Sequence, residues 1–419
     1  MITIGKQALN HHPYEIDPER HINVIGGSGV GKSSLLEHIF LEFLKQQGHG
    51  GLFIDPHGDT ADRLPLLIPK NRRRDIIWFD PDAYAVPPLN PLYFTDPEQL
   101  ELAKETCLTI LKALSGSESA WGNATPYNIR NDLDAVTENS ANIAMPTLVH
   151  VFRFLVDEPY RKLLMDASEN PFVKLFQAQI ESIRDVNSLL APGVNKLAKL
   201  MRPNIISTIG QPNSLDLLKI MNEGKIIICR FSKGRLGEET AQILYSLIVS
   251  MVSIAALKRE QQSVRPPFMI VADEAQNAIH GGRFGTLLAE ARKYGISLVT
   301  AFQGFYQVPF ADDILTNAAT QIVFNASGDD AITMSKNWNQ PEVQPQNISE
   351  LSRYEFYSRT FEGNQPVVRK ILAPPQLKLH FKTDKAKHAT FEKTISESLK
   401  NWSTDRRGVT AKINKFLAS

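Results

Sequence analysis

Residues 26 to 33 are Gly26-Gly27-Ser28-Gly29-Val30-Gly31-Lys32-Ser33. They match the phosphate-binding pattern G-x-x-x-x-G-K-[ST] at every defined position. An apolar run, His21-Ile22-Asn23-Val24-Ile25, precedes the glycines, and a helical pattern begins at Ser34. A strand, a glycine-rich loop and a helix in this order form the context that a nucleotide-phosphate loop requires. A glycine-rich turn that matches by chance would not explain the lysine, the serine and both flanks together.

The residue types in this loop suit a nucleoside triphosphate and a magnesium ion. Backbone N–H groups can surround phosphate oxygens, and the N-terminus of the following helix adds partial positive charge. Lys32 can reach the β- and γ-phosphates, and the Ser33 hydroxyl can bind Mg²⁺. We predict nucleotide contacts from the following residues: Gly26, Gly27, Ser28, Gly29, Val30, Gly31, Lys32, Ser33 and Ser34.

A second motif supplies the acids that hydrolysis needs. The apolar run from Phe268 to Ala272 predicts a buried strand, and it ends in Asp273-Glu274. Unpaired carboxylates next to a core are costly, so a purely structural role explains this pair poorly. We predict that Asp273 holds the Mg²⁺ together with Ser33, and that Glu274 polarises the attacking water.

The composition predicts a globular protein of about two domains. The chain has 419 residues, of which 42% are hydrophobic and 22% charged, with a net charge of +1. This charge excludes a global basic field, so any nucleic-acid surface must be local. Cys107 and Cys229 lie far apart and predict buried thiols rather than a disulfide. No signal peptide is expected, and the apolar run 243–257, which is too short to span a membrane, predicts a buried helix.

The pattern of apolar residues predicts an α/β fold: a RecA-like P-loop core with a mainly parallel central sheet, plus an inserted all-α domain. Strand-like runs alternate with helical ones in 1–95 and again in 219–380, whereas 96–218 has helical periodicity and no strong strand. Thr147 and Asp185 are expected to cap helices there. We therefore predict an ATPase core from the first two ranges and a helical insertion from the third.

The final range, 381–419, is predicted to be a basic tail. From Lys382 onward it holds nine Lys or Arg and four Asp or Glu residues, a net charge of +5. A DNA-contacting or partner-binding arm and an ordinary amphipathic terminal helix both fit this composition.

Three further groups of polar residues permit two interpretations each. The turn that carries Asp55, His57 and Asp59 follows a strand, so its side chains either face the phosphates or serve the turn alone. The run Arg72-Arg73-Arg74 either contacts DNA phosphates or forms a solvated face, which the sequence favours. Gln303, at the end of the strand 296–302, either senses the γ-phosphate or is a structural amide.

The order of these motifs resembles the HerA/FtsK superfamily of ring-forming translocases. Within it, the likeness is to the cytoplasmic motor of the coupling proteins of conjugation and type IV secretion. The matching segments are HINVIGGSGVGKSSL, LFIDPHGD, RDIIWFDPDA, NPL at 90–92, KIIICRFSKGRLG, FMIVADEAQNA, LLAEARKYGISLVTAFQ and ILTNAATQIVFNASGDDA. The likeness covers most of residues 1–375, is weak in the helical insertion and is absent from the tail.

The resemblance implies an ATP- and Mg²⁺-dependent motor that assembles as a homo-oligomer, a hexamer in this family, and moves DNA through a central pore without reading its sequence. It implies that Arg292, in the stretch Glu290-Ala291-Arg292-Lys293-Tyr294-Gly295, acts on a neighbouring subunit's nucleotide. It also strengthens the sensor role of Gln303. The segments 232–236 and 281–283 are the expected DNA-contacting loops.

Coupling proteins usually carry N-terminal transmembrane helices, and HerA carries an N-terminal β-barrel domain. Here the phosphate loop comes only 25 residues after Met1. We therefore expect a cytoplasmic motor that a membrane-anchoring or relaxase-type partner recruits to the inner face of the membrane.

Two other functions stay open at this point. A related secretion ATPase would drive protein export or pilus assembly without moving DNA. A small-molecule kinase or GTPase switch fits less well, because Lys32 and Asp273 are far apart for a compact kinase and Asn195-Lys196-Leu197-Ala198 lacks the aspartate of a guanine motif.

Overall fold

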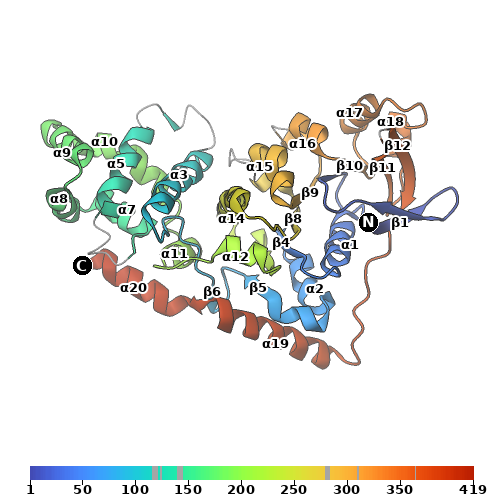
Figure 1. Cartoon of the computed structure of the whole chain (residues 1–419), viewed down its shortest axis with the longest axis horizontal. Coiled ribbons are helices and arrows are strands. Elements are labelled where there is room, and N and C mark those ends of the chain that lie inside the picture. The colour runs from blue at the N-terminus through green and yellow to red at the C-terminus, as the bar shows by residue number, and fades with distance from the viewer. Residues whose placement is uncertain (116–120, 123–124, 139–144, 279–283, 309–310, 364) are drawn as a thin grey trace.

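The computed structural model of the chain describes residues 1–115, 121–122, 125–138, 145–278, 284–308, 311–363 and 365–419. Figure 1 shows an elongated molecule, with an α/β body that carries both a large sheet and the N-terminus, and a group of helices at the other end. The predicted α/β class with an added helical part is confirmed.

One eleven-stranded sheet runs through the body in the order β2-β1-β12-β11-β10-β3-β9-β8-β4-β7-β5. Every neighbouring pair from β10 to β5 is parallel, and the pairs from β2 to β10 are antiparallel. Its strands are β1 (Ile2–Gln7), β2 (Pro13–Ile16), β3 (Ile22–Ile25), β4 (Gly50–Asp55), β5 (Ile76–Phe79), β7 (Ile226–Arg230), β8 (Phe268–Ala272), β9 (Ile296–Phe302), β10 (Thr320–Val323), β11 (Glu355–Glu362) and β12 (Gln365–Leu372). The mainly parallel central sheet is thus confirmed.

The central strands are apolar along their whole length because helices cover both faces of the sheet. All residues of β3, β4, β8 and β9 are buried, as expected for parallel strands between two helical layers. On one face, α1 (Lys32–Leu44) packs Leu36, Ile39 and Phe40 into the core that contains Val24. On the other face, α14 (Glu238–Lys258) packs against the same sheet.

Helix α14 is the one helix among the described residues that is long and apolar enough to cross a membrane. The candidate span runs from Glu238 to Gln261, and 83% of its most apolar window is buried inside the molecule. A core helix passes the same test of length and composition. Its burial agrees with the prediction of a buried helix at 243–257, although the helix is longer than that run.

The described part of 87–225 contains helices and no sheet strand. The caps predicted there are present: Thr147 Oγ1 accepts a hydrogen bond from Val149 N at 3.2 Å, and Asp185 Oδ1 accepts one from Ser188 N at 3.2 Å. Its helices are α3 (Pro97–Ala113), α5 (Thr125–Glu138), α7 (Leu148–Val156), α8 (Glu158–Ala167), α9 (Pro171–Ser182), α10 (Val186–Ala198), α11 (Pro203–Ile209) and α12 (Leu217–Asn222).

The remaining helices lie around the body, except α20, which packs against the helical part. They are α2 (Asp59–Leu67), α13 (Lys233–Leu236), α15 (Phe284–Glu290), α16 (Ala311–Asn317), α17 (Gly328–Trp338), α18 (Pro345–Ser349), α19 (Asp384–Trp402) and α20 (Arg406–Ala418), with short 3-10 turns at Lys70–Asp75 (η1), Arg259–Gln261 (η2), Ala275–Ala278 (η3), Ala291–Tyr294 (η4) and Phe305–Gln307 (η5). The segment Ser232–Gly237, predicted as a loop, contains α13, whose Leu236 is buried.

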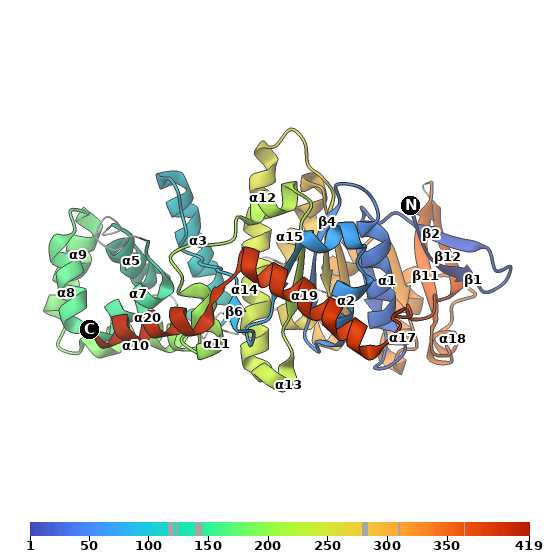
Figure 2. The ribbon, with the colours of Figure 1, turned by 90° about the horizontal axis from the view of Figure 1, so that it is seen from below.

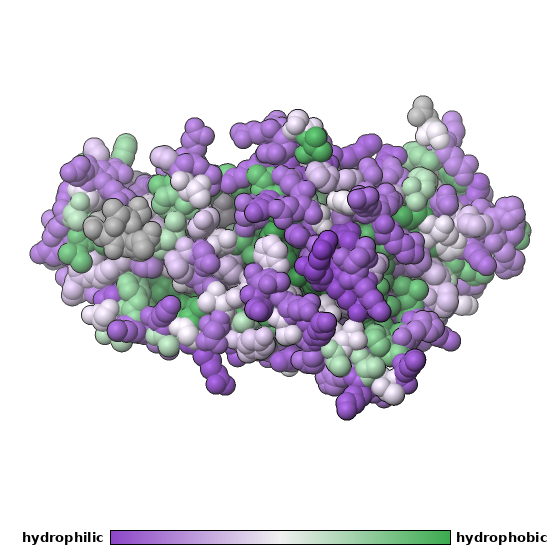
Figure 3. Space-filling view, turned by 60° about the horizontal axis from the view of Figure 1, so that its bottom comes forward, coloured by the Kyte–Doolittle hydropathy of each residue, from purple (hydrophilic) through white to green (hydrophobic). Residues whose placement is uncertain are grey.

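The basic tail lies along both parts of the molecule. Helix α19 packs on β5, where Ser398 Oγ accepts a hydrogen bond from Trp78 N at 2.8 Å. Two residues, β13 (Thr404–Asp405), then pair with β6 (Ala85–Val86), and α20 packs Val409 and Ile413 against the helical part. Figure 2 shows α19 and α20 crossing from the body to the helices, and Figure 3 shows that the side along which α19 runs is mostly hydrophilic. Of the two interpretations of the tail, this geometry fits amphipathic terminal helices.

In the arginine run 72–74, only Arg74 is exposed. Arg72 and Arg73 neither form a solvated face nor are free to contact DNA. Arg72 donates hydrogen bonds to the carbonyl oxygens of Leu44 (3.1 Å), His49 (2.9 Å) and Gly224 (2.7 Å). Arg73 donates to two carbonyls at the end of α2. The favoured interpretation was therefore wrong for Arg72 and Arg73, because their side chains donate hydrogen bonds to backbone carbonyl groups that would otherwise lack partners.

A buried ion pair links the helix after the phosphate loop to the rest of the body. Glu37 on α1 is 1% exposed, and Arg63 on α2 donates to its two carboxylate oxygens at 2.7 and 3.0 Å. Arg63 also donates to the carbonyl of Leu377 at 2.6 Å, just before the tail. Removing the arginine would leave a buried carboxylate without its partner.

We predict that Arg63→Ala lowers the free energy of unfolding by about 3–5 kcal/mol, the usual effect of breaking a buried ion pair. The control is Arg369→Ala, which removes a 3.4 Å pair between two exposed side chains, Arg369 and Glu362, and should cost at most about 1 kcal/mol. Urea unfolding of both variants measures this, and equal losses would contradict the structural role of Arg63.

Candidate active site

The predicted site residues meet because the parallel strands that carry them end at one edge of the sheet. Ile25 at the end of β3 pairs with Phe302 at the end of β9, and Ala272 at the end of β8 pairs with Thr300. The loop after β3, the acids after β8 and Gln303 after β9 therefore leave the sheet side by side. The carboxyl edge of an open α/β sheet is where ligands bind in this class of fold.

The phosphate loop has the backbone conformation that its glycines permit. Gly29 and Gly31 have φ angles of 75° and 118°, in the left-handed region. A Cβ atom on Gly31 would lie 2.7 Å from the ring of Tyr354, whereas one on Gly29 would meet nothing within 4 Å. The space beside Gly29 lets a bound group approach the backbone closely, and Gly31 permits a close protein contact.

Lys32 lies inside the loop at the start of α1. Its Nζ donates to the carbonyl oxygens of Gly26 and Gly27, both at 2.7 Å. Burial lowers the pKa of this lysine, while the charges of Glu274 and Asp273 raise it in part. A buried ammonium group inside the loop suits a ligand with several negative charges.

Ser33 and Asp273 place two oxygen ligands together. The Ser33 hydroxyl donates to Asp273 Oδ2 at 2.9 Å. Burial and the charge of Asp55 raise the pKa of Asp273 to about 6, although the Ser33 hydrogen bond lowers it. A hydroxyl and a carboxylate are the oxygen ligands that Mg²⁺ takes from a protein when phosphates and waters complete its shell. These two residues therefore fit the predicted magnesium site.

Glu274 is held in a conformation that non-glycine residues rarely adopt. Its φ is 50°, and it is 7% exposed. Asn277 donates to its backbone carbonyl from both its amide N–H (2.9 Å) and its side chain (2.7 Å), and the Tyr245 hydroxyl donates to the preceding carbonyl of Asp273 at 3.0 Å. Strain that several bonds enforce is typical of functional sites.

The side chain of Glu274 is surrounded by donors. Burial raises its pKa, but the ion pair with His57, hydrogen bonds from Gln303 and Gln276 and the charge of Lys32 outweigh burial and lower the pKa to about 2. Gln303 Nε2 donates to Oε1 at 3.0 Å, and His57 Nε2 lies 3.8 Å from the same oxygen. A carboxylate that stays ionised and is oriented by an amide can position and polarise water.

The turn after β4 contributes one residue to this cluster and uses another for its own structure. The ion pair with Glu274 raises the pKa of His57, against the effect of burial. Asp55 accepts hydrogen bonds from His57 N (2.8 Å) and Ala61 N (2.9 Å), which fixes the turn. Asp59 is exposed in the first turn of α2. Asp55 thus serves the turn itself, and His57 lies beside Glu274.

Arg292 does not join the site of its own chain. It precedes β9 and so lies at the amino edge of the sheet, and the seven residues of β9 place it roughly 20 Å from the phosphate loop. Arg292 is exposed. Burial chiefly lowers the pKa of His21, at the amino end of β3, to about 4. The charge of Arg292 contributes to this lowering.

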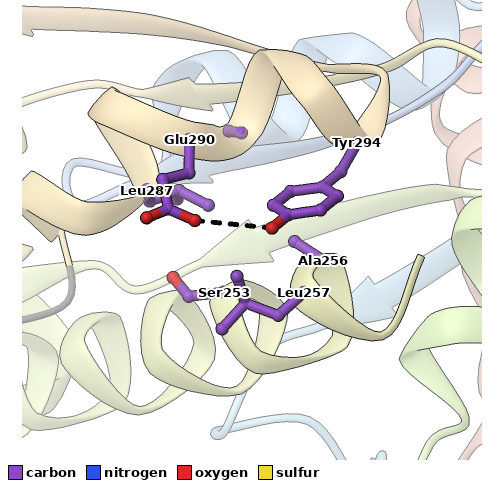
Figure 4. A pocket seen from close by; sticks show the side chains of 7 residues that line it. Ser253, Ala256, Leu257, Leu287, Glu290 and Tyr294 are labelled. Carbon is purple, nitrogen blue, oxygen red and sulfur yellow. Dashed lines mark hydrogen bonds between the residues drawn. The ribbon is translucent and has the colours of Figure 1, made fainter. Parts of the chain in front are cut away.

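The segment that carries Arg292 is nevertheless fixed. Figure 4 shows Leu287, Glu290 and Tyr294 facing Ser253, Ala256 and Leu257 of α14, around a small apolar space. The fully buried Arg259 donates to the Tyr294 carbonyl at 2.8 Å, and Arg265 donates to the Lys293 carbonyl at 2.7 Å. Arg292 is therefore an exposed cation on a rigid support.

Two residues beside the phosphate loop were missed from the sequence. Asn325, just after β10, accepts a hydrogen bond from Gly27 N at 2.8 Å, and its place after a strand at the same edge was a usable signal. Tyr354 donates from its backbone N to the Val30 carbonyl at 2.9 Å. No local pattern marked Tyr354, because only the fold brings it to the loop.

Of the two expected DNA-contacting loops, 232–236 lies within the described residues. Residues 281–283 lie outside the described residues. In 232–236, Arg235 pairs with Asp80 at 3.7 Å and with Asp82 at 3.3 Å, and it is half exposed.

Comparisons with known proteins agree with this geometry. Residues 3–252 match the family described as the central domain of the helicase HerA, and residues 267–377 match the family described as the TraM recognition site of TraD and TraG. No curated protein sequence matches the chain.

Solved structures share the fold at low sequence identity. The bacterial conjugative coupling protein TrwB, without its first 70 residues, superposes with a TM-score of 0.68 at 16% identity, over 91% of each chain. TrwB in complex with ADP and Mg²⁺ gives 0.63 at 17% identity, over 91% of this chain and 92% of that one. VirB4 of Thermoanaerobacter pseudethanolicus gives 0.55 at 16% identity, over 89% and 96%.

We predict that Lys32→Ala and Glu274→Gln abolish ATP turnover for different reasons. Lys32→Ala should lose nucleotide binding, while Glu274→Gln should bind ATP and lower kcat by at least about 100-fold, because it removes the group that polarises water. Steady-state ATPase assays and nucleotide titrations measure both effects. The control is Glu223→Gln, an exposed residue paired with Lys219, and wild-type turnover in Glu274→Gln would contradict the catalytic assignment.

Proposed function

The chain belongs to the family of the HerA helicase central domain, and on this premise we propose that it is an ATP-hydrolysing ring motor that translocates DNA in conjugation or type IV secretion. The observation that supports this most is the division of the site between two edges of the sheet. Lys32, Asp273 and Glu274 lie together at the carboxyl edge, whereas Arg292 stands exposed at the other. A ring in which each subunit completes its neighbour's site uses both edges.

In this proposal the chain's own residues divide the work of hydrolysis. The backbone of residues 26–34 and Lys32 hold the phosphates of ATP, and Ser33 and Asp273 hold Mg²⁺. The ion would neutralise charge on the phosphate oxygens. Glu274 polarises the attacking water, and Gln303, bonded to Glu274 at 3.0 Å, reports the presence of the γ-phosphate to it.

Arg292 acts in trans. Its guanidinium would stabilise the charge that develops on the γ-phosphate of the neighbouring subunit's ATP. The hydrogen bonds from Arg259 and Arg265 to the segment that carries Arg292 matter for this role, because an arginine that acts on a neighbouring site must be held in place to be effective.

The cargo is inferred from the relatives. TrwB is a conjugative coupling protein by name, and the second family match is named for the recognition of TraM by TraD and TraG. We propose a homohexamer with DNA in a central pore, contacted through phosphates by the segments 232–236 and 281–283. A relaxase-type or membrane-anchoring partner would recruit this cytoplasmic motor to the inner face of the membrane.

The domain division also stays a proposal. We assign 1–95 and 219–380 to the RecA-like core, 96–218 to the helical insertion and 381–419 to the basic tail. The tail supports a connecting role, since α19 packs on the core and α20 on the helical part.

A second function shares the same chemistry. A type IV secretion ATPase that drives protein export or pilus assembly is supported by the net charge of +1 and by the likeness to VirB4. The two functions differ in their response to DNA. Membership of the HerA family leaves no support for a small-molecule kinase or a GTPase switch.

We predict that long DNA stimulates ATP turnover several-fold regardless of its sequence, and that added salt weakens the effect because the contacts are to phosphates. ATPase assays with DNA of two unrelated sequences, over a series of salt concentrations, measure this. Unchanged turnover at low salt would contradict DNA translocation and favour the protein-export function.

We predict that Arg292→Ala alone and Glu274→Gln alone are inactive, and that mixing them restores turnover. In rings assembled from equal amounts, about one interface in four pairs an intact Glu274 with an intact Arg292, so about a quarter of wild-type activity is expected. Reassembly of the mixture must be verified by mass measurement. Confirmed mixed rings without activity would place each site within a single chain.

A further inference from the structure

The segment before β11 is anchored to the phosphate loop in a strained conformation. Tyr354 has a φ of 68°, in the left-handed region that an aromatic residue rarely adopts. Its backbone N donates to the Val30 carbonyl at 2.9 Å, and its carbonyl accepts from Ala373 N at 2.8 Å. These two bonds hold the strain, and strain held in this way tends to mark a binding or catalytic position.

The side chains of this segment form a stacked pair at the edge of the loop. The Tyr354 ring contacts Gly31, where an added Cβ would come within 2.7 Å of it. The Arg353 guanidinium lies over the Tyr354 ring, 4.8 Å from its centroid, and is exposed. The nearby Glu355 is paired with Lys370 at 3.0 Å, and none of the ion pairs within the described residues involves Arg353.

The position of this pair follows from the direction of the bound triphosphate. The hydrolysed end must lie near Glu274 and Gln303, at the ends of β8 and β9. The phosphates form a linear chain, so the nucleoside end must leave the loop on the opposite side of β3, which is the side of β10.

Residues on that side bring the stacked pair to the loop. Asn325, after β10, accepts from Gly27 N at 2.8 Å, and its side-chain amide donates to the carbonyls of Ser349 (2.6 Å) and Leu351 (3.0 Å). The segment 349–354 is thereby fixed beside the loop, at the place that the nucleoside would reach.

We propose that Arg353, supported by the ring of Tyr354, is the nucleoside-binding residue of this chain and stacks its guanidinium on the nucleobase. A planar, weakly hydrated guanidinium stacks well on aromatic faces, and Tyr354 limits its freedom before the ligand arrives. This inference rests on the proposed ATPase function. It assigns the binding of the phosphates to the loop and the binding of the nucleoside to Arg353.

The test compares two ligands that share phosphates and differ in the nucleoside. Titrations in the presence of Mg²⁺ measure the binding of ATP and of inorganic tripolyphosphate to wild type and to Arg353→Ala. Loss of a stacked cation should weaken ATP binding about tenfold and change tripolyphosphate binding by less than about twofold. In turnover assays KM for ATP should rise by the same factor while kcat stays within about twofold, because the contact does not depend on the transition state.

The control is Arg369→Ala, an exposed arginine on β12 paired with Glu362, which should change neither ligand's affinity. Equal weakening of both ligands in Arg353→Ala would make Arg353 a phosphate contact, and no weakening of either would remove it from the site; each result overturns the inference and leaves the ATPase proposal intact. If wild type binds neither ligand, or if Lys32→Ala binds both as well as wild type does, the proposed function fails and the inference with it. Arg353 is exposed, so its truncation should leave thermal unfolding unchanged.

Discussion

The parallel register of β3, β9 and β8 is the constraint on which the candidate site depends. Because Ile25 pairs with Phe302 and Ala272 with Thr300, the phosphate loop, the acidic pair and Gln303 leave the sheet at one edge. A shift of one residue would turn every side chain of a strand to the other face. The Ser33–Asp273 hydrogen bond, at 2.9 Å, exists only in this register. The buried strands and the helices α1 and α14 therefore serve the site by fixing the register.

In the proposed ring, the same sheet lets each subunit supply groups to two nucleotide sites. A strand has two ends, and β9 carries Gln303 at one and the Arg292 segment before the other. His21 lies at the amino end of β3, where its ring accepts a hydrogen bond from Leu298 N of β9 at 3.0 Å. The two strands that connect the edges are thus also bonded to each other at the far end.

The sequence predicted the parts of the site that depend on local pattern. The loop at 26–33 and the strand ending in Asp273-Glu274 each carry their signal within about ten residues, and the mainly parallel sheet followed from the alternation of strand-like and helical runs. Contacts between distant residues could not be predicted. Arg72 satisfies carbonyls of Leu44 and Gly224, far away on either side of it in the chain, and Tyr354 meets a loop that lies more than 300 residues before it. Composition identified the tail as basic, but only the fold reveals that α19 and α20 lie along two different parts of the molecule.

The central claim is that two subunits share each nucleotide site, and an image of the assembled protein tests it most directly. Electron cryo-microscopy of the chain with DNA, Mg²⁺ and a non-hydrolysable ATP analogue would locate the nucleotide and both edges of every subunit. The account predicts a closed ring in which the γ-phosphate lies between Glu274 of one subunit and the Arg292 guanidinium of the next. A nucleotide-bound assembly whose Arg292 side chains all face solvent, away from every nucleotide, would contradict it.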